Sequence, residues 1–304
     1  MKKDTRSDQK RRLRRRRNLE RRRYRALVSS APSLRLATVP KFNEQSPNED
    51  FATSGKGFIA LSDGAGGCGL YADMWSQYLV GELSREQPIT SFEQLDNWVE
   101  GIWEPFYNRY EAKAKEGDAM LLNKFYSEGS CATLVAAWLV DKKQCHWMAY
   151  GDSLLFHYDK SSGELWHSFT KLGDFDRPPY LISCKDPLVA EGFKHGVIEV
   201  KEESLIFACS DALSELVLMM YQVSKWDEYQ SELEALVNEQ TSVSPMVQVA
   251  REMELDFWKD LLEPLYESAR SNNSFAQLMR RWYDQGLVEL DDYTVVFMTP
   301  KTPL

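Results

Sequence analysis

The sequence predicts an α+β fold in which strands and helices are grouped in separate blocks along the chain. Short apolar runs divided by turn sequences fill residues 131–169, which predicts strands joined as an antiparallel meander. Residues 213–286 instead place apolar side chains at a period of 3.6 residues, which predicts helices. With 304 residues, the chain can bury a sizeable core as one large domain or two small ones.

Residues 1–30 form an arginine-rich arm. Residues 1–26 contain 14 Lys or Arg and 3 Asp or Glu, a net charge of +11, whereas the rest of the chain carries −20. Because like charges this close repel one another, we expect the arm to lack stable structure until an anionic partner screens it. The arm is therefore a candidate tether to nucleic acid or to an anionic membrane surface, and the alternative is a solvated tail without a specific role.

The folded domain, which we place at residues 31–304, begins with a strand. Residues 34–39 alternate between apolar and polar side chains. A glycine-rich turn follows at residues 64–67, and apolar residues between positions 74 and 83 recur at helical spacing. A strand, a turn and a helix are therefore expected before the strand-rich block.

A second helix precedes the strand-rich block, and a long loop follows it. Ser91 and Gln94 form the pattern of a capping box, so this helix is expected to begin there, with a kink at Pro105. Residues 171–196 contain several prolines and no clear period, which we interpret as an irregular loop. Loops of that length often serve as functional flaps.

Composition excludes several classes of protein. The five cysteines are scattered without a Cys-x-x-Cys pair, which argues against a zinc site and for reduced, mostly buried thiols. No segment approaches the roughly 18 to 20 apolar residues that cross a membrane, and no apolar segment follows the basic start as in a signal peptide. We therefore expect a cytoplasmic protein. Motifs of thiol phosphatases, P-loop NTPases and serine hydrolases are absent from the sequence.

Carboxylates stand at the ends of three apolar runs. Asp63 ends the first run and is followed by Gly64, Asp211 ends the second, and Asp291 precedes the third. If the third strand runs antiparallel to the other two, these acidic ends share one sheet edge. Asp50, which precedes the first run, is expected at the same edge. Each motif alone is also typical of an ordinary turn, since Asp and Gly both favour turns.

The chemistry of this acidic set indicates a hard cation. Carboxylates without Cys or His partners suit Mg²⁺ or Mn²⁺, which take oxygen ligands and keep waters, better than they suit zinc. The residue types at these strand ends therefore predict a site for a hard cation.

Six motifs occur in one order along the chain: Asn-Glu-Asp at 48–50, Ser-Asp-Gly-Ala-Gly-Gly at 62–67, Gly-Ser-Cys-Ala-Thr at 129–133, Gly-Asp-Ser at 151–153, Ser-Asp-Ala at 210–212 and Asp-Asp-Tyr-Thr at 291–294. In order and spacing they resemble the motifs of the metal-dependent type 2C protein phosphatase family, in a divergent bacterial branch. The resemblance covers most of the chain. It implies a four-layer α-β-β-α sandwich with two central antiparallel sheets.

The resemblance also implies the reaction. Members of this family are serine/threonine protein phosphatases, which hydrolyse phosphoserine and phosphothreonine in phosphoprotein substrates with a metal-activated water. The cofactors implied are two Mn²⁺ or Mg²⁺ ions. The positions that match the family's metal ligands are Asp50, Asp63, Gly64 through its carbonyl, Asp211 and Asp291.

Within this implied set, Asp63 would bridge the two ions and Asp50 would hold one of them. Asp211 would hold the other together with Asp291, so Asp63 and Asp211 are the implied catalytic residues. Asp152 and Glu215 match positions that can hold a weaker third ion, with Glu215 standing where an Asp is usual.

Three departures from the family pattern favour an alternative function. Ala65 replaces a histidine found in many eukaryotic members, Ala212 replaces a glycine, and Gln45 or Ser46 replaces a phosphate-binding arginine. The alternative is a catalytically weak pseudophosphatase that acts as a binding or regulatory module. Retention of the four metal aspartates favours the enzyme. A third reading is an unrelated enzyme with a carboxylate-rich metal site.

Overall fold

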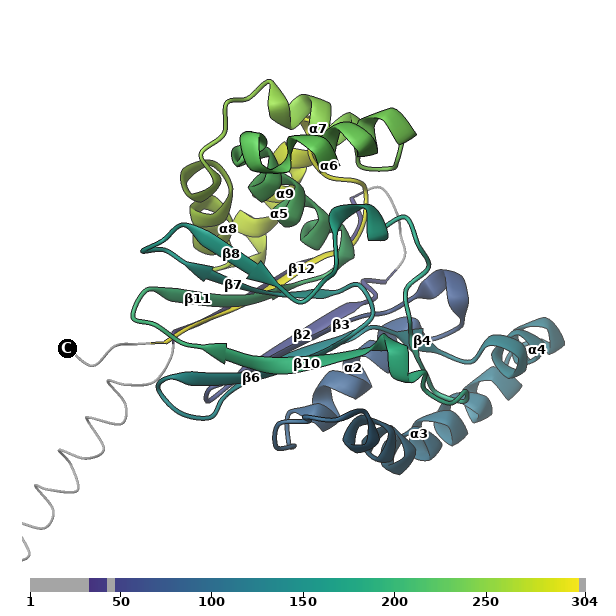
Figure 1. Cartoon of the computed structure of the whole chain (residues 1–304). Helices are drawn as coiled ribbons and strands as arrows, with labels where there is room; N and C mark the ends of the chain where they lie inside the picture. Colours follow the sequence, from purple (N-terminus) through teal and green to yellow (C-terminus); the bar gives the residue numbers. More distant parts are fainter. Residues whose placement is uncertain (1–32, 43–46, 301–304) are drawn as a thin grey trace, which may run out of the picture.

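The computed structural model describes residues 33–42 and 47–300. Within these ranges, two five-stranded antiparallel sheets are stacked, with helices on both outer surfaces (Figure 1). This arrangement is the α-β-β-α sandwich that the resemblance implied. The arginine-rich arm at residues 1–30 lies outside the described residues, so the expectations for it stay predictions.

The first sheet pairs the first and last described strands of the chain. Its spatial order is β1 (Ser33–Val39), β12 (Tyr293–Thr299), β11 (Ser204–Cys209), β7 (Leu154–Asp159) and β8 (Glu164–His167), and every neighbouring pair is antiparallel. Strand β11 is buried along its whole length. Leu205, Phe207 and Cys209 pack with the helices, whereas Ile206 and Ala208 pack between the sheets. Burial on both faces explains why this strand is one continuous apolar run.

The second sheet contains the first candidate ligands. Its spatial order is β10 (Phe193–Glu199), β6 (Gln144–Tyr150), β5 (Leu134–Leu139), β3 (Phe58–Asp63) and β2 (Asp50–Gly55), again with antiparallel neighbours throughout. The short strands β4 (Cys131–Ala132) and β9 (Ile182–Ser183) pair separately. Asp50 and Asp63 lie directly opposite each other in the register of β2 and β3. Two carboxylates therefore meet at one end of this sheet.

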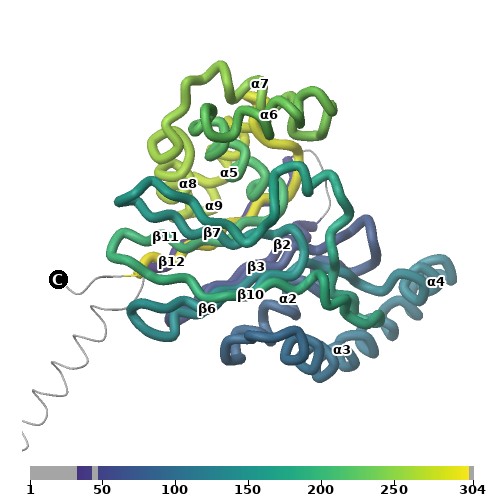
Figure 2. Tube along the Cα trace, viewed as in Figure 1, coloured from purple at the N-terminus to yellow at the C-terminus, as the bar shows by residue number. Residues whose placement is uncertain are grey.

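Helices cover the two outer faces (Figures 1 and 2). The first sheet carries α5 (Asp211–Ser224), α6 (Trp226–Glu239), α7 (Ser244–Arg251), the π-helical turn η4 (Phe257–Leu262), α8 (Glu263–Ser268) and α9 (Asn272–Asp284). The second carries α2 (Ala72–Leu83), α3 (Phe92–Lys115) and α4 (Ala119–Glu128), and the short helices η1 (Gly66–Cys68), η2 (Leu172–Asp174) and η3 (Ala190–Gly192) lie in loops. Residues 213–286 are thus helical, as their period indicates. No helix in the described part of the chain combines the length and apolar character needed to span a membrane.

Three apolar cores hold the layers together. One lies between the first sheet and α5–α9, a second between the other sheet and α2–α4, and a third between the two sheets. Fully buried aromatic side chains such as Phe207 and Trp75 each stabilise their layer by about 1.5–3 kcal/mol. The four-layer packing fixes the ends of the strands, where the acidic residues lie, relative to one another. All five cysteines are free, and only Cys68 is exposed.

The expected meander at residues 131–169 is wrong, because the chain changes sheets within it. β5 and β6 form a hairpin in the second sheet, whereas β7 and β8 form one in the first. The crossing occurs at residues 151–153, where Gly151 has a φ of +103°. The same residue types occur in a hairpin turn and in a crossover between two sheets. Strands that are buried on both faces are apolar throughout, so their sequence does not indicate to which sheet they belong.

The expectation of a single sheet edge for the acidic ends is also corrected. Strand β3 belongs to the second sheet, whereas β11 and β12 belong to the first. The antiparallel relation of β12 to β11 is as expected. The acidic ends come together because the two sheets are stacked with these strand ends at the same end of the sandwich.

Several elements escaped the sequence analysis. Strand β2 and helix α4 had no counterpart among the expected elements, and strand β10 begins inside the segment interpreted as a loop at 171–196. Most residues of β10 are partly or fully exposed, because it is the edge strand of its sheet. An exposed edge strand lacks the apolar run that identifies a buried one. Helix α3 continues through Pro105, and the kink expected there stays a prediction.

Candidate metal centre

A cavity of about 460 Å³ opens at the end of the sandwich where β3, β11 and β12 bring their acidic ends. Five predicted ligands line it: Asp63, Gly64, Asp152, Asp211 and Asp291. Residues 175–179 and Leu181, from the long loop after β8, complete the wall. Asp50 is buried behind the lining, opposite Asp63. The structure therefore gathers residues that are up to 241 positions apart in the sequence, from Asp50 to Asp291.

Asp63 is held at the end of β3 by Thr133. The N–H of Thr133 donates to the carbonyl of Asp63 at 2.8 Å, and the N–H of Asp63 donates to Thr133 Oγ1 at 3.1 Å. Thr133 Oγ1 also shares a hydrogen bond of 2.7 Å with Ser153 Oγ, next to Asp152. One hydroxyl group thus links the backbones that carry Asp63 and Asp152.

The glycine-rich turn after Asp63 allows close approach of three backbone segments. The N–H of Gly64 donates to the carbonyl of Glu49 at 3.0 Å. A Cβ atom at Gly64 would lie 2.6 Å from the carbonyl oxygen of Ala72, and one at Gly66 would lie 2.1 Å from Glu49 Oε1. Glycine is required at Gly64 because backbone atoms occupy the space that a side chain would need. The carbonyl of Gly64 accepts the N–H of Gly66 at 3.0 Å, and its role as a metal ligand stays a prediction.

Asp211 is the first residue of α5, directly after the end of β11. Helix N-termini carry unpaired N–H groups and favour negative charge. The preceding Ser210 joins this end of β11 to β12, since its Oγ accepts the N–H of Thr294 at 3.0 Å and its N–H donates to the carbonyl of Thr294 at 3.1 Å. These bonds fix Asp211 near the start of β12, where Asp291 lies.

Asp291 and Asp292, at the start of β12, contact the loop that leads to β2. Lys41 Nζ lies 3.0 Å from Asp291 Oδ1. Asp292 accepts the N–H groups of Lys41 and Glu49, each at 2.8 Å. Burial acts to lower the pKa of Lys41, but its hydrogen bond to Asp291 and the charges of Asp291, Asp292 and Glu49 raise the pKa above its usual value.

The acidic side chains raise one another's pKa. Burial, followed by the charges of Asp50, Asp211, Asp152 and Asp291, holds the pKa of Asp63 well above its usual range. Burial and the charges of Asp291, Asp152 and Asp50 do the same for Asp211. Burial raises the pKa of Asp50 to about 7 and that of Asp152 to about 6. These carboxylates are thus close enough to destabilise each other's charge, which a bound cation would relieve.

The residues present fit a hard divalent ion in their chemistry. Asp50 Oδ2 is buried and has no hydrogen-bond partner among the described residues, which is rare for a carboxylate, and a bound cation would satisfy this oxygen. The surrounding donors are all oxygens, as Mn²⁺ and Mg²⁺ prefer. Within residues 33–42 and 47–300, however, no three His, Cys, Asp or Glu side chains have the arrangement of a finished metal cage. The ligand assignments therefore stay predictions.

Glu215 lies apart from the other candidates. It does not line the cavity, and the charges acting on it come from Glu289 and Asp176 rather than from Asp152. Burial, with these two charges, raises its pKa to about 7. Asp176 lines the acidic cavity, so Glu215 lies next to that cavity without lining it, and the third-ion role inferred for Asp152 and Glu215 stays a prediction.

Several residues that position the candidate ligands were missed as such in the sequence. Thr133, Ser153 and Ser210 fall inside the recognised motifs, so their hydroxyl groups were a usable signal. Lys41 lies outside every motif and nine positions before Asp50, so only the folding of its loop reveals it.

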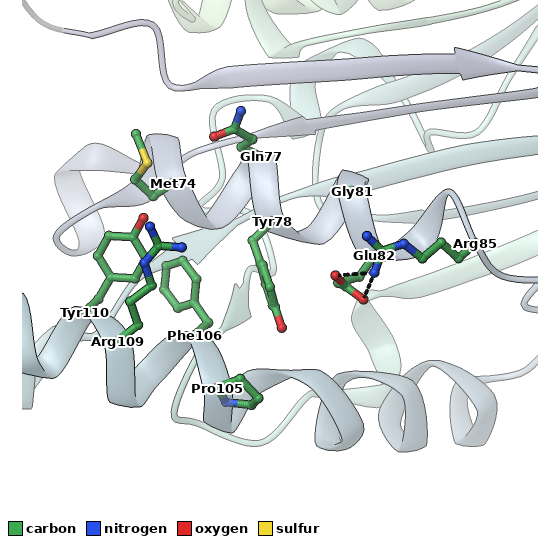
Figure 3. Close-up of a pocket in the computed structure, with 10 residues that line it drawn as sticks. All are labelled: Met74, Gln77, Tyr78, Gly81, Glu82, Arg85, Pro105, Phe106, Arg109 and Tyr110. Atoms are coloured by element: carbon green, nitrogen blue, oxygen red, sulfur yellow. Dashed lines mark hydrogen bonds and ion pairs between the residues drawn. The ribbon is translucent and has the colours of Figure 1, made fainter.

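A second cavity of about 420 Å³ lies between α2 and α3 (Figure 3). The side chains of Tyr78 and Phe106 lie between the two helices, Met74 also lines the cavity, and Glu82 pairs with Arg85 at its edge. Gly81 lines this cavity, and a Cβ atom added at Gly81 would meet nothing within 4 Å. This cavity contains none of the candidate ligands, so the chemistry indicated by the sequence belongs to the acidic cavity.

Solved structures share this architecture. The catalytic domain of the serine/threonine protein phosphatase PstP, in complex with two manganese ions, is similar with a TM-score of 0.53 and 15% identity over 90% of this chain and 99% of that one. PppA, a regulatory component of the T6SS in Pseudomonas aeruginosa, has a TM-score of 0.51 and 15% identity over 88% and 97%. Stp1 from Staphylococcus aureus has 0.50 and 14% over 89% and 96%. The chain has the type 2C phosphatase fold.

The likeness is one of structure rather than sequence. No protein-family model matches the chain, and no curated protein matches it. The type 2C fold nevertheless covers nearly the whole described chain and nearly the full length of each solved domain. The fold expected from the sequence motifs is thereby confirmed, and this chain is a structural match to bacterial type 2C phosphatases at low sequence identity.

Proposed function

We propose that the protein is a metal-dependent serine/threonine protein phosphatase. The observation that supports this most is the convergence of Asp50, Asp63, Asp211 and Asp291 at one end of a type 2C phosphatase fold. Burial and the charges of neighbouring carboxylates raise the pKa of Asp63 and of Asp211 there. Asp63 and Asp211 are the proposed catalytic residues, and the cofactors are two Mn²⁺ or Mg²⁺ ions, as PstP holds two manganese ions. The substrate class is phosphoserine or phosphothreonine in a phosphoprotein.

The proposed mechanism uses each carboxylate to bind and orient a cation. When bound, two divalent ions supply an activated water and neutralise negative charge on the phosphoryl group. Asp63, between the two sheets, would bridge the ions, Asp50 would hold one, and Asp211 with Asp291 would hold the other. The hydrogen bonds of Thr133 and Ser210 keep the backbones of these ligands in place before any ion arrives.

Protonation of the leaving group has no obvious side-chain donor in the glycine-rich turn. Ala65 lines the cavity where many eukaryotic members have His, and its methyl group cannot donate a proton. Solvent in the cavity, which is open, would have to supply the proton. We therefore expect slower turnover than in members that have this histidine.

Turnover of a phosphothreonine peptide by the purified protein tests the proposal. We expect hydrolysis with Mn²⁺ or Mg²⁺, none after exhaustive EDTA treatment, and recovery when Mn²⁺ is restored. Undiminished turnover in EDTA would refute the metal-dependent mechanism.

The second candidate function is a pseudophosphatase that binds a partner without turnover. Ala65, Ala212 and the absence of the phosphate-binding arginine at Gln45 or Ser46 favour it. Mn²⁺ binding without measurable hydrolysis of several phosphopeptides would select this alternative over the enzyme.

A further inference from the structure

The acidic cavity contains two cations among its described lining residues, Lys41 and Arg177. Arg177 Nη1 pairs with Asp174 at 3.1 Å, and its side chain is largely exposed. Lys41 instead reaches a candidate ligand, since its Nζ lies 3.0 Å from Asp291 Oδ1. In the described part of the chain, Lys41 is thus the basic side chain of this cavity that touches the proposed metal-binding set.

The position of Lys41 is set by contacts that do not involve its ammonium group. Its N–H donates to Asp292 Oδ1 and the N–H of Glu49 donates to Asp292 Oδ2, each at 2.8 Å, so one carboxylate holds both ends of the loop. The neighbouring Phe42 packs on Tyr293, with ring centroids 5.5 Å apart. The backbone at Lys41 is therefore tied to the start of β12, and its side chain is kept within reach of Asp291.

We propose that Lys41 is an internal counter-cation that competes with a divalent ion for Asp291. This inference rests on the proposed function, because it takes Asp291 as a metal ligand. An ammonium group 3.0 Å from a carboxylate oxygen uses the charge and one lone pair that an ion would need. A lysine side chain is protonated at neutral pH, so an ion has to displace it from Asp291.

The competition makes the two halves of the site unequal. On the side of Asp50, one buried carboxylate oxygen has no partner within residues 33–42 and 47–300, so an ion arriving there displaces none of these residues from it. On the side of Asp291, an ion must first break the pair with Lys41. We therefore expect two binding steps, with the weaker step at the Asp211 and Asp291 side.

Calorimetric titration of the metal-stripped, full-length protein with MnCl₂ tests this. In Lys41→Met and Lys41→Gln, the weaker step is expected to tighten by about tenfold, since breaking a partly buried ion pair no longer opposes it. Lys41→Arg keeps the charge and should stay within about threefold of wild type. Lys115→Met, which removes the same charge from an exposed pair with Glu111 on α3, is the control and should leave both steps unchanged.

The outcomes separate this inference from the proposed function. Unchanged or weaker Mn²⁺ binding in both Lys41→Met and Lys41→Gln would overturn the inference, and so would equal tightening in Lys115→Met. If the wild-type protein binds Mn²⁺ and Asp63→Asn loses that binding, the proposed metal site stands whatever Lys41 does. If wild type and Asp63→Asn both fail to bind Mn²⁺, the proposed function and this inference are refuted together.

Discussion

At the scale of single residues, the acidic cluster combines two opposing demands. Asp50, Asp63 and Asp211 must lie close enough to share cations, yet without a cation burial and the charges of neighbouring carboxylates raise the pKa of each. Functional sites commonly carry such a stability cost, because the arrangement that suits a ligand is unfavourable without it. The effect on activity and the effect on stability of a substitution here should therefore have opposite signs.

Neutralising one carboxylate tests this relation. Asp63→Asn and Asp211→Asn are each expected to lower Mn²⁺-dependent turnover by at least about a hundredfold, since a metal ion contributes several kcal/mol of transition-state stabilisation. In EDTA their melting temperatures should equal or exceed that of wild type, because one repelling charge is gone. Turnover and thermal melts of Asp227→Asn, on the exposed surface of α6, provide the control. Near-wild-type turnover in either variant would contradict the assignment.

The raised pKa values also predict how stability depends on pH in EDTA. Burial raises the pKa of Asp50 to about 7 and of Asp152 to about 6, above the values of about 4 in an unfolded chain. The folded state therefore binds more protons than the unfolded state between these values, and its stability falls as pH rises. We expect a loss of about 2–4 kcal/mol between pH 5 and pH 8 by urea denaturation. Asp50→Asn should flatten this slope, and stability that rises over the same range would refute the prediction.

At the scale of elements, the turn between β3 and α2 is the most constrained loop of the site. Gly64 lies so close to Ala72 and Glu49 that a methyl group would contact backbone carbonyl oxygens at 2.6 and 2.8 Å. Neither carbonyl belongs to a flexible side chain, so the turn itself would have to move. Since Asp63 immediately precedes this turn, its carboxylate would move with it.

Gly64→Ala is thus expected to cost about 1–3 kcal/mol of folding free energy and to lower turnover more than stability alone explains. Gly81→Ala, in the open cavity between α2 and α3 (Figure 3), is the matched control. It should stabilise the protein by about 0.5–1 kcal/mol and leave turnover unchanged, because a helical glycine gains from a Cβ where space is free. Urea denaturation and peptide turnover of both variants test these two expectations. Equal behaviour of the two would show that the close approach at Gly64 is not a constraint.

At the scale of the whole molecule, charge is divided unevenly along the chain. Residues 1–26 carry +11 and the remainder −20, and each proposed ligand lies at Asp50 or later. A basic segment and an acidic body suggest separate tasks, binding of an anionic partner by the arm and hydrolysis by the folded domain. The arm lies outside the described residues, so this division of labour rests on the sequence.

Deleting residues 2–25 tests whether the arm binds the anionic partner and the folded domain alone carries out hydrolysis. Hydrolysis of a small aryl phosphate should stay within about twofold of the full-length rate, because a small substrate does not need the arm. Binding to RNA or to anionic vesicles by the full-length protein should weaken steeply with salt and disappear in the truncated protein, as counterion release requires. Binding that survives truncation would place the anionic site on the body, and altered aryl phosphatase activity would indicate that the arm contacts the acidic domain instead.

Three features could be predicted from the sequence alone: the fold class, the helical block at 213–286 and the positions of the acidic residues at strand ends. These features depend on local periodicity and on turn residues, and both are visible in short stretches of the sequence. The acidic ends at Asp63, Asp211 and Asp291 were identifiable in this way. The oxygen-only character of the proposed site was likewise a property of residue types.

How these elements and residues meet in space could not be predicted and is seen only in the folded structure. It assigned β6 and β7 to different sheets, because two faces buried alike leave no pattern that distinguishes one sheet from the other. It brought Lys41 to Asp291, across 250 positions of sequence, and set Glu215 beside Glu289 and Asp176 instead of in the cavity. Such contacts depend on how whole sheets and helices pack, so they cannot be predicted from any short stretch of the sequence.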